Sequence, residues 1–445
     1  MPATRHCINL RNEVPRRAFA GAHWALLSAP PFPHSRCVSL QHTQVTFHYE
    51  RLRAVTTGIM EAAGTTFLLL IAVRHFNAGP TAKALIAAGG SVGHLISPFV
   101  VNRATQLGWP VAQAASRVGF VGAGALLLAV FAPGLPLYVL GSVIATTCAS
   151  AAIPLMTQVY QTNYPPMERG RLFSKAMVVR IGMAALANEL GGRLLAVHLE
   201  YFRALLLFFA AAFAFGAWCQ SRIPSEPLTA SAGTHPLRAL HYAREDRLFR
   251  LTLISWMFMG MGNLMMYPLR VEYLANERYG LKLDVTMVAL FVGVIPNAAR
   301  LVCSPVWGWL FDRMNFFTLR AVLNVGFALG ILSFFVSDSY AGLALGAVIF
   351  GVSNAGGDVA WSLWVTKFAP PERVADYMSV HTFFTGVRGV AAPLIAFHLV
   401  GTMGMTNMAW MCTALIAVSV VMLGTEVPLG RKAKPATPTT EEVSE

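Results

Sequence analysis

Long apolar stretches alternate with short polar ones along most of this chain. From about residue 54 onward, each apolar stretch is close to the roughly 20 residues that a helix needs to cross about 30 Å of hydrocarbon. We therefore expect an all-α polytopic membrane protein with twelve transmembrane helices. The predicted spans are at about 54–74, 80–101, 112–132, 135–157, 173–196, 203–221, 250–270, 285–307, 319–337, 341–366, 376–399 and 405–424.

The polar segments divide the chain into five parts. The longest connection, 222–249, separates two groups of six spans, at 51–221 and 250–424. Residues 1–50 carry Arg among Pro, His and Ser, and residues 425–445 are polar and charged, so we expect both segments to be disordered and cytoplasmic. For the first segment, a targeting peptide and an upstream start codon that is not used in the cell both stay open.

Composition separates this chain from soluble proteins. It is 55% hydrophobic and only 12% charged, with a mean hydropathy of +0.54, whereas soluble proteins carry about 25% charged residues. The net charge of +13 comes from short basic clusters between apolar runs, so we expect no nucleic-acid partner. The six cysteines are scattered, so we expect no disulfide, no metal site and no cofactor.

Lys and Arg are unevenly distributed among the connections. The segments at 133–134, 338–340 and 400–404 hold none, whereas the alternate connections are basic. Because positive connections stay in the cytoplasm, we expect the N- and C-termini on that side of the cell (inner) membrane. Connections near Lys83 and Arg278 run against this rule. We expect the protein to be a monomer in the lipid bilayer.

The two groups of six spans contain a weak internal repeat. Ser97-Pro98 and Val118-Gly119-Phe120 recur as Ser304-Pro305 and Val325-Gly326-Phe327, at the same spacing. Apolar helices reuse a small alphabet, so one such match would mean little. Several in one frame predict two parallel six-helix repeats, related by an axis along the membrane normal.

A charged break separates the eighth and ninth spans. Gly308 suits a tight turn because it has no Cβ, and Asp312 can accept hydrogen bonds from loop or helix-end N–H groups. Arg313 and Arg320 give the predicted turn a positive face.

This break resembles a loop signature of the major facilitator superfamily, G-x-L-a-D-R-x-G-(R/K)-(R/K). Gly308 to Arg313 follow it closely, with Asn315 in place of the second Gly. The copy in the first half, at 101–106, has lost its Asp and Arg. The resemblance covers about 54–424 and implies two helix bundles, alternating access, and a gating role for Gly308, Asp312 and Arg313.

A second signature of the family is only partly present. The fifth-span pattern of antiporters, G-x-x-x-G-P-x-x-G-G, survives as Gly191-Gly192, with Ala187-Asn188 where Gly-Pro is expected. This departure argues against a drug/proton antiporter. The resemblance still implies a central cavity lined mainly by the first, fourth, seventh and tenth spans.

Charged residues inside the spans each need an explanation, because each costs about 2.5–3.5 kcal/mol in a bilayer. Glu61 is either a proton-coupling acid or substrate ligand, or the structural partner of an arginine, and we expect it to pair with Arg180. Asp358 can neutralise Arg300 or Arg388. An arginine that faces the cavity unpaired would favour an anionic substrate, because guanidinium suits carboxylate or phosphate.

Other polar residues in the spans suggest further roles. Trp361 and Asn263, an aromatic ring and an amide, suit a sugar-like solute, although packing is the commoner role of such rings. Glu189 with Arg193 is expected to be a structural pair. His94 and His381 can carry protons, but histidines near helix ends are more often satisfied structural residues.

The pattern as a whole favours a transporter. We expect a secondary active or facilitative transporter of a small organic solute, sugar-like or an organic anion, with proton coupling left open. The alternative is a polytopic membrane sensor or enzyme without transport activity. The chain contains no His-Glu-x-x-His, no phosphate-binding loop and no segment long enough for a soluble output domain, so we expect no enzyme activity.

Overall fold

The computed structural model describes residues 40–165, 168–227, 242–281, 283–364 and 374–424. Residues 1–39 and 425–445, which belong to the segments predicted to be disordered, lie outside these residues, as does half of the linker, at 228–241. The first half contains α1 (Leu40–Ala62), η1 (Ala63–Phe67), α2 (Leu68–Arg74), α3 (Pro80–Gln106), α4 (Val111–Val130), α5 (Leu135–Ala151), α6 (Ile153–Asn163), α7 (Arg169–Val197), η2 (Leu199–Tyr201) and α8 (Phe202–Ser221). The second half contains α9 (Tyr242–Glu245), α10 (Arg247–Ala275), η4 (Glu277–Tyr279), α11 (Val285–Ala289), η5 (Leu290–Val294), α12 (Ile295–Arg313), α13 (Phe316–Phe335), α14 (Tyr340–Leu363), α15 (Val374–Met403) and α16 (Met405–Gly424).

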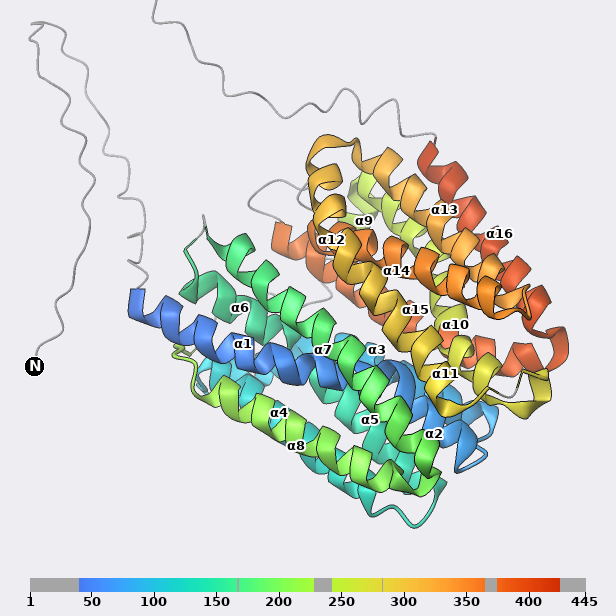
Figure 1. The fold of residues 1–445 in the computed structure, drawn as a ribbon. Coiled ribbons are helices and arrows are strands. Elements are labelled where there is room, and N and C mark those ends of the chain that lie inside the picture. The colour runs from blue at the N-terminus through green and yellow to red at the C-terminus, as the bar shows by residue number, and fades with distance from the viewer. Residues whose placement is uncertain (1–39, 166–167, 228–241, 282, 365–373, 425–445) are drawn as a thin grey trace, which may run out of the picture.

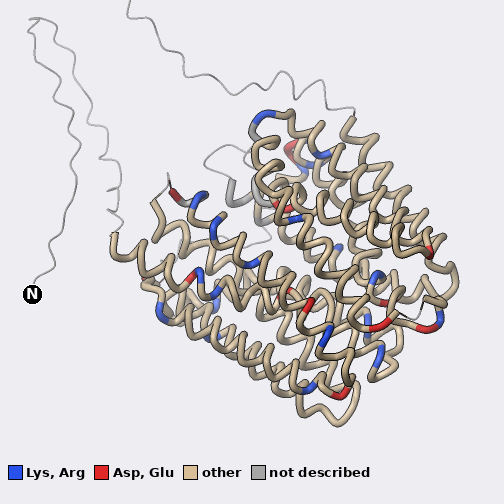
Figure 2. The backbone as a smooth tube through the Cα atoms, viewed as in Figure 1, with Lys and Arg blue, Asp and Glu red and all other residues tan. Residues whose placement is uncertain are grey.

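The helices form two bundles, one from each half of the chain (Figure 1). The end of the molecule at which α8 ends and α10 begins is called the linker end here, and the opposite end is called the far end. The bundles converge at the far end and diverge towards the linker end. Figure 2 shows that charged residues lie mostly near helix ends, with a smaller number inside the bundles, while the long helix faces are uncharged.

The prediction of an all-α membrane protein is confirmed. Within the described residues, eleven helical segments are long and apolar enough to cross a membrane, and they overlap every predicted span except the fifth. The fifth span corresponds to α7, which is 29 residues long. Its hydropathy is lowered by its charged residues, which include Lys175, Arg180, Glu189 and Arg193.

The first helix begins earlier than predicted. It runs over Leu40–Arg74 and contains 35 residues, about 52 Å at a rise of about 1.5 Å per residue. We expected disorder up to residue 50, but the early turns are held by α6. Thr43 Oγ1 donates to Asn163 O (2.8 Å), and Asn163 Nδ2 donates to Thr46 Oγ1 (2.9 Å). Polar side chains that hydrogen-bond to a neighbouring helix do not raise the hydropathy of their own segment. Hydropathy therefore could not predict this part of the helix.

The charged break between the eighth and ninth spans is shorter than predicted. α12 continues through Gly308 to Arg313, so the turn-based explanation of this glycine was wrong. A Cβ at Gly308 would meet nothing within 4 Å. The chain turns at Met314 and Asn315, where Asn315 Oδ1 accepts a 2.8 Å hydrogen bond from the N–H of Phe317. Continuing the helix satisfies backbone groups that a longer loop would leave unpaired.

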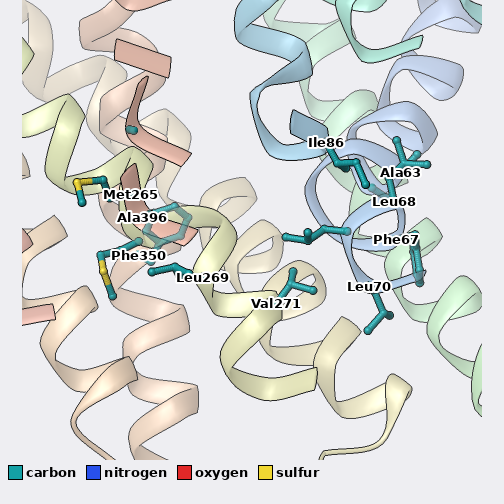
Figure 3. Packing of buried hydrophobic residues seen from close by; sticks show 14 of the residues in the cluster. Ala63, Phe67, Leu68, Leu70, Ile86, Met265, Leu269, Val271, Phe350 and Ala396 are labelled. Atoms are coloured by element: carbon teal, nitrogen blue, oxygen red, sulfur yellow. The ribbon is translucent and has the colours of Figure 1, made fainter. Parts of the chain in front are cut away.

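The hydrophobic core joins the two halves near the far end. One cluster of buried side chains includes residues of η1, α2 and α3 together with residues of α10, α14 and α15. Figure 3 shows Leu68 and Leu70 on one side of the boundary between the halves and Leu269 and Val271 on the other. A second cluster is confined to the first half. The far end is therefore the more tightly packed contact between the halves.

The predicted repeat agrees with the packing. Pro98 lies inside α3 and Pro305 inside α12, which are the second spans of their halves. Gly141 of α5 allows close approach of α4, and Gly346 of α14 allows close approach of α13 in the same way. Equivalent spans thus make equivalent contacts in the two halves.

Candidate functional site

Four charged side chains form a continuous chain of ion pairs where the two halves meet. Arg180 Nε, from α7, donates to Glu61 Oε2 of α1 at 2.6 Å. Arg300 of α12 donates to Glu61 Oε1 through Nη1 at 2.5 Å and to Asp358 Oδ2 of α14 through Nε at 2.6 Å. The contacts expected for Glu61 with Arg180 and for Asp358 with Arg300 are present. The bond between Glu61 and Arg300, which crosses between the halves, was not predicted.

The middle of this ion-pair chain is more buried than its ends. The side chains of Arg300 and Glu61 are 6% and 14% exposed, whereas those of Arg180 and Asp358 are 34% and 38% exposed. The four charges alternate in sign and sum to zero. Removing one charge would leave its neighbour uncompensated in a dehydrated setting, which is costly. The ion-pair chain therefore ties the two bundles together.

Both central residues lie close to a π-helical turn. η1 follows Glu61, and Thr65 Oγ1 within it donates to Glu61 O at 2.8 Å. η5 precedes Arg300, and Asn297 Nδ2 donates to Gly293 O at 2.9 Å. η1 and η5 also contact each other. π-helical turns are rare in proteins, and those that do occur are frequently found at functional sites. The position of η1 and η5 therefore supports a functional role for this region.

A small polar cavity adjoins Glu61 and Arg300. Its volume is about 20 Å³, which is room for about one water molecule. Tyr267, Asn297 and Asn354 contribute further polar groups to its wall. In this conformation the cavity can hold a water beside Glu61 but has no space for an organic solute.

A second set of polar contacts closes the far end. Lys83 Nζ of α3 pairs with Glu272 Oε1 of α10 at 2.5 Å, and their side chains are only 9% and 2% exposed. Asn276 Nδ2 donates to the same oxygen at 2.8 Å. Arg74 Nη2 donates to Leu283 O at 2.5 Å. These bonds fasten α2 and α3 of the first half to α10 and the segment before α11.

Glycines allow α7 to approach the second half closely. A Cβ on Gly192 would lie 2.7 Å from the Cβ of Ala289 in α11. A Cβ on Gly293 of η5 would overlap the side chain of Asn188 in α7. Of the Gly-Gly pair that remains of the fifth-span signature, Gly192 therefore lies at a contact between the halves, whereas Gly191 packs against Phe67 of the first half.

Arg388 does not join the ion-pair chain. The sequence left it as a possible partner of Asp358, but Asp358 bonds to Arg300 instead. Arg388 Nη1 donates to the carbonyl oxygen of Trp256 at 2.5 Å, and its Nη2 donates weakly to Thr385 Oγ1 at 3.3 Å. Its guanidinium group therefore bonds to uncharged acceptors.

Trp361 and Asn263 do not line the small cavity beside Glu61. The Trp361 ring is 6.4 Å from the ring of His94 in α3 and 5.6 Å from that of His381 in α15. Asn263 Oδ1 is buried without a hydrogen-bond partner among the described residues. The expectation that the histidines are satisfied was wrong for His381, because neither of its buried ring nitrogens has a partner within the described part of the chain.

The predicted gating residues are only partly described. Gly308 lies within α12, and the side chain of Asp312 lies outside the described residues. The Arg313 guanidinium lies 4.3 Å from the centre of the Trp309 ring. Their gating role stays a prediction.

Sequence reasoning missed five buried charges, which are Glu50, Lys83, Arg270, Glu272 and Arg320. Lys83 and Glu272 lie near the ends of two spans of opposite halves, and the exception to the charge rule at Lys83 was the signal that could have found this pair. Arg320 was assigned to an exposed turn, but it lies in α13 and is only 1% exposed. Its spacing from the preceding charged residues did not indicate that it is buried.

The Major Facilitator Superfamily model matches residues 54–393 and, in a second match, residues 281–444. No curated protein matches the chain in sequence. A variant of the nucleoside transporter NupG is similar in structure, with a TM-score of 0.70, 13% identity, and coverage of 87% of this chain and 99% of that one. A D-xylose–proton symporter has a TM-score of 0.64 and 14% identity, covering 89% and 98%. A bacterial homologue of the human lysosomal transporter Spinster, inward-facing and unoccupied, has a TM-score of 0.60 and 13% identity, covering 90% and 98%.

Proposed function

The chain belongs to the Major Facilitator Superfamily, and on that premise we propose that it is a proton-coupled secondary transporter of a small organic anion. Family and fold are those of multi-pass transporters that move solutes across a membrane. The proposal adds the charge of the solute and the coupling ion. It rests on one observation, the position of Glu61 between Arg180 and Arg300 of opposite halves.

Charge balance links a proton to an anion at this position. While Glu61 is ionised, the four charges of the ion-pair chain cancel and the halves are tied together. Protonation of Glu61 leaves one net positive charge and a guanidinium group without its acceptor. A carboxylate or phosphate group of the solute can replace Glu61, because guanidinium binds such groups through two parallel hydrogen bonds.

The same exchange couples binding to movement of the halves. When Glu61 is protonated, its carboxyl group becomes neutral. The ion pair between Glu61 and Arg300, which joins the two halves at the middle of the interface, is then weakened. Loss of the proton returns Glu61 to both arginines and displaces the anion. One proton then accompanies one monovalent anion, so that transport is electroneutral.

The described conformation is closed on the side of the membrane that the far end faces. The far end is closed by the Lys83–Glu272 pair, whereas the bundles diverge towards the linker end. The distribution of Lys and Arg assigns the linker end to the cytoplasm. We take this conformation to be inward-facing, in a monomer of the cell (inner) membrane.

Uptake into proteoliposomes tests the proposal directly. The purified full-length protein is given a panel of carboxylates, organic phosphates, sugars and nucleosides, with and without a pH gradient. We expect a carboxylate or phosphate ester to accumulate only when the outside is the more acidic side. Accumulation that does not depend on the pH gradient would rule out proton coupling. If no anion on the panel is transported, an anionic solute is ruled out.

A neutral sugar-like solute is the second candidate. Asn263 Oδ1 is an unpartnered acceptor, and Trp361 supplies an aromatic face in the same half. The solved structures include a nucleoside transporter and a D-xylose–proton symporter. Transport of sugars or nucleosides, but of no anion, in the same assay would favour this candidate.

A further inference from the structure

Two arginines of the second half share one indole ring. The Arg320 guanidinium of α13 lies 3.6 Å from the centre of the Trp256 ring in α10, and that of Arg388 in α15 lies 5.6 Å from it. The two residues are 1% and 4% exposed. His381 of α15 is 1% exposed, with its ring 5.0 Å from that of Trp256. Two cations and an imidazole therefore surround one tryptophan inside the bundle.

Most of the donors in this cluster have no acceptor. Arg320 Nη1 and Nη2, Arg388 Nε and the Trp256 indole N–H are buried without a hydrogen-bond partner among the described residues. Both ring nitrogens of His381 are also unpartnered there. Within the described residues, no carboxylate forms an ion pair with Arg320 or Arg388. As far as the described residues go, the cluster is thus rich in donors and contains no carboxylate.

The other buried arginines differ from this pair. Arg300 is paired with two carboxylates, and the partly buried Arg53 is paired with Glu50. Arg270 is 1% exposed and forms no ion pair with a described carboxylate, but it is a single cation next to three rings, the nearest being Phe350 at 3.2 Å. Arg320 and Arg388 instead share one ring and repel each other. An uncompensated buried charge costs several kcal/mol, so a neutralising group is needed.

We propose that the second half holds a compact oxyanion of the carboxylate or phosphate class between Arg320, Arg388 and His381, beside the Trp256 ring. Guanidinium groups bind such oxyanions through paired, charge-assisted hydrogen bonds. Indole N–H and imidazole supply further donors. The near-complete burial of all four side chains limits the ligand to a small anion and disfavours the headgroup of a lipid in the surrounding bilayer.

This site goes beyond the proposed transport function. Its residues come from α10, α13 and α15 of one half, whereas the Glu61 ion-pair chain joins α1 and α7 to α12 and α14. The anion bound there is a resident of the second half and differs from the solute that crosses. Its binding can be measured in detergent without any gradient, so its failure would leave the transport proposal untouched.

Thermal unfolding of the purified full-length protein tests the site. The protein is exchanged into a buffer free of small anions, and inorganic phosphate, acetate or chloride is then titrated at constant ionic strength. We expect phosphate or acetate to raise the unfolding temperature saturably, by roughly 2–4 °C. No rise with either oxyanion, or a rise with chloride alone, would overturn the proposal.

Variants show where the oxyanion binds. Arg320→Gln and Arg388→Gln are expected to abolish the oxyanion-dependent rise. In the anion-free buffer, Arg320→Gln is expected to be at least as stable as the wild type, because it removes an uncompensated buried charge. Arg270→Gln is the matched control and should keep the full rise. Loss of the rise in Arg270→Gln as well, or its persistence in both other variants, would refute the site.

Discussion

A single carboxylate, Glu61, carries the proposed coupling. Replacing Glu61 with Gln keeps the shape of the side chain but fixes the ion-pair chain at one net positive charge. With one proton per monovalent anion, a gradient of one pH unit should give the wild type roughly tenfold accumulation. We expect Glu61→Gln to bind the anion but to show no accumulation above the outside concentration. Uptake of labelled solute at several pH gradients measures this.

The matched control for this variant is Glu189→Gln. Glu189 also pairs with an arginine, Arg193, at 2.5 Å, as the sequence predicted, but that arginine is 71% exposed. An exposed pair contributes little, so Glu189→Gln should accumulate solute like the wild type. Uphill uptake by Glu61→Gln equal to that of the control would remove Glu61 from the coupling role.

Among the elements, α3 and α10 are joined by the buried Lys83–Glu272 pair at the far end. Removing one partner of a buried ion pair costs about 3–5 kcal/mol, since it leaves the other charge uncompensated. We expect Glu272→Gln to lower the unfolding temperature by several degrees, and the charge swap Lys83→Glu with Glu272→Lys to restore most of the loss. Thermal unfolding of the three proteins in detergent decides this. Equal destabilisation by the swap and the single change would mean that packing, not charge, matters at this contact.

The close contact between α7 and α11 offers a steric test of far-end closure. A side chain at Gly192 would collide with Ala289, so Gly192→Val should hold the far ends apart and reduce the uptake rate by roughly tenfold or more. Gly182 lies in the same helix, and a Cβ there meets nothing within 4 Å, so Gly182→Val serves as control. Initial rates of uptake, normalised to reconstituted protein, measure both. If both variants transport at the wild-type rate, the far-end contact does not limit the cycle.

Hydropathy was enough to predict the elements but not their ends. Each predicted span overlaps a helix because crossing hydrocarbon requires a long apolar stretch with every backbone group bonded. The start of α1 was missed because Thr43 and Thr46 are satisfied by α6, a contact that no local pattern encodes. Gly308 was placed in a turn because glycine is a turn signal in water, whereas α12 simply continues through it.

For the molecule as a whole, sequence identified the important charges better than their partners. Glu61, Arg180, Arg300 and Asp358 stood out because charge is rare inside apolar spans. The bond between Glu61 and Arg300 joins residues 239 positions apart in opposite halves, so spacing could not indicate it. For Arg320 the sequence did not even identify the residue as important. A charged residue near a polar break is expected to be exposed unless the packing around it is known.

The orientation of the whole molecule rests on the Lys and Arg distribution and can be tested with single cysteines. Thr402 is exposed at the far end, and Gln106 is exposed at the end of α3 on the linker side. In a chain whose native cysteines are replaced by Ser, we expect a membrane-impermeant maleimide to label Thr402→Cys in intact cells. Gln106→Cys should be labelled only after the cells are permeabilised, because the basic connections stay in the cytoplasm. The reverse pattern would turn the described conformation into an outward-facing one. The solute would then enter the linker side from outside the cell, and the direction of proton-driven uptake in proteoliposomes would have to be reassigned.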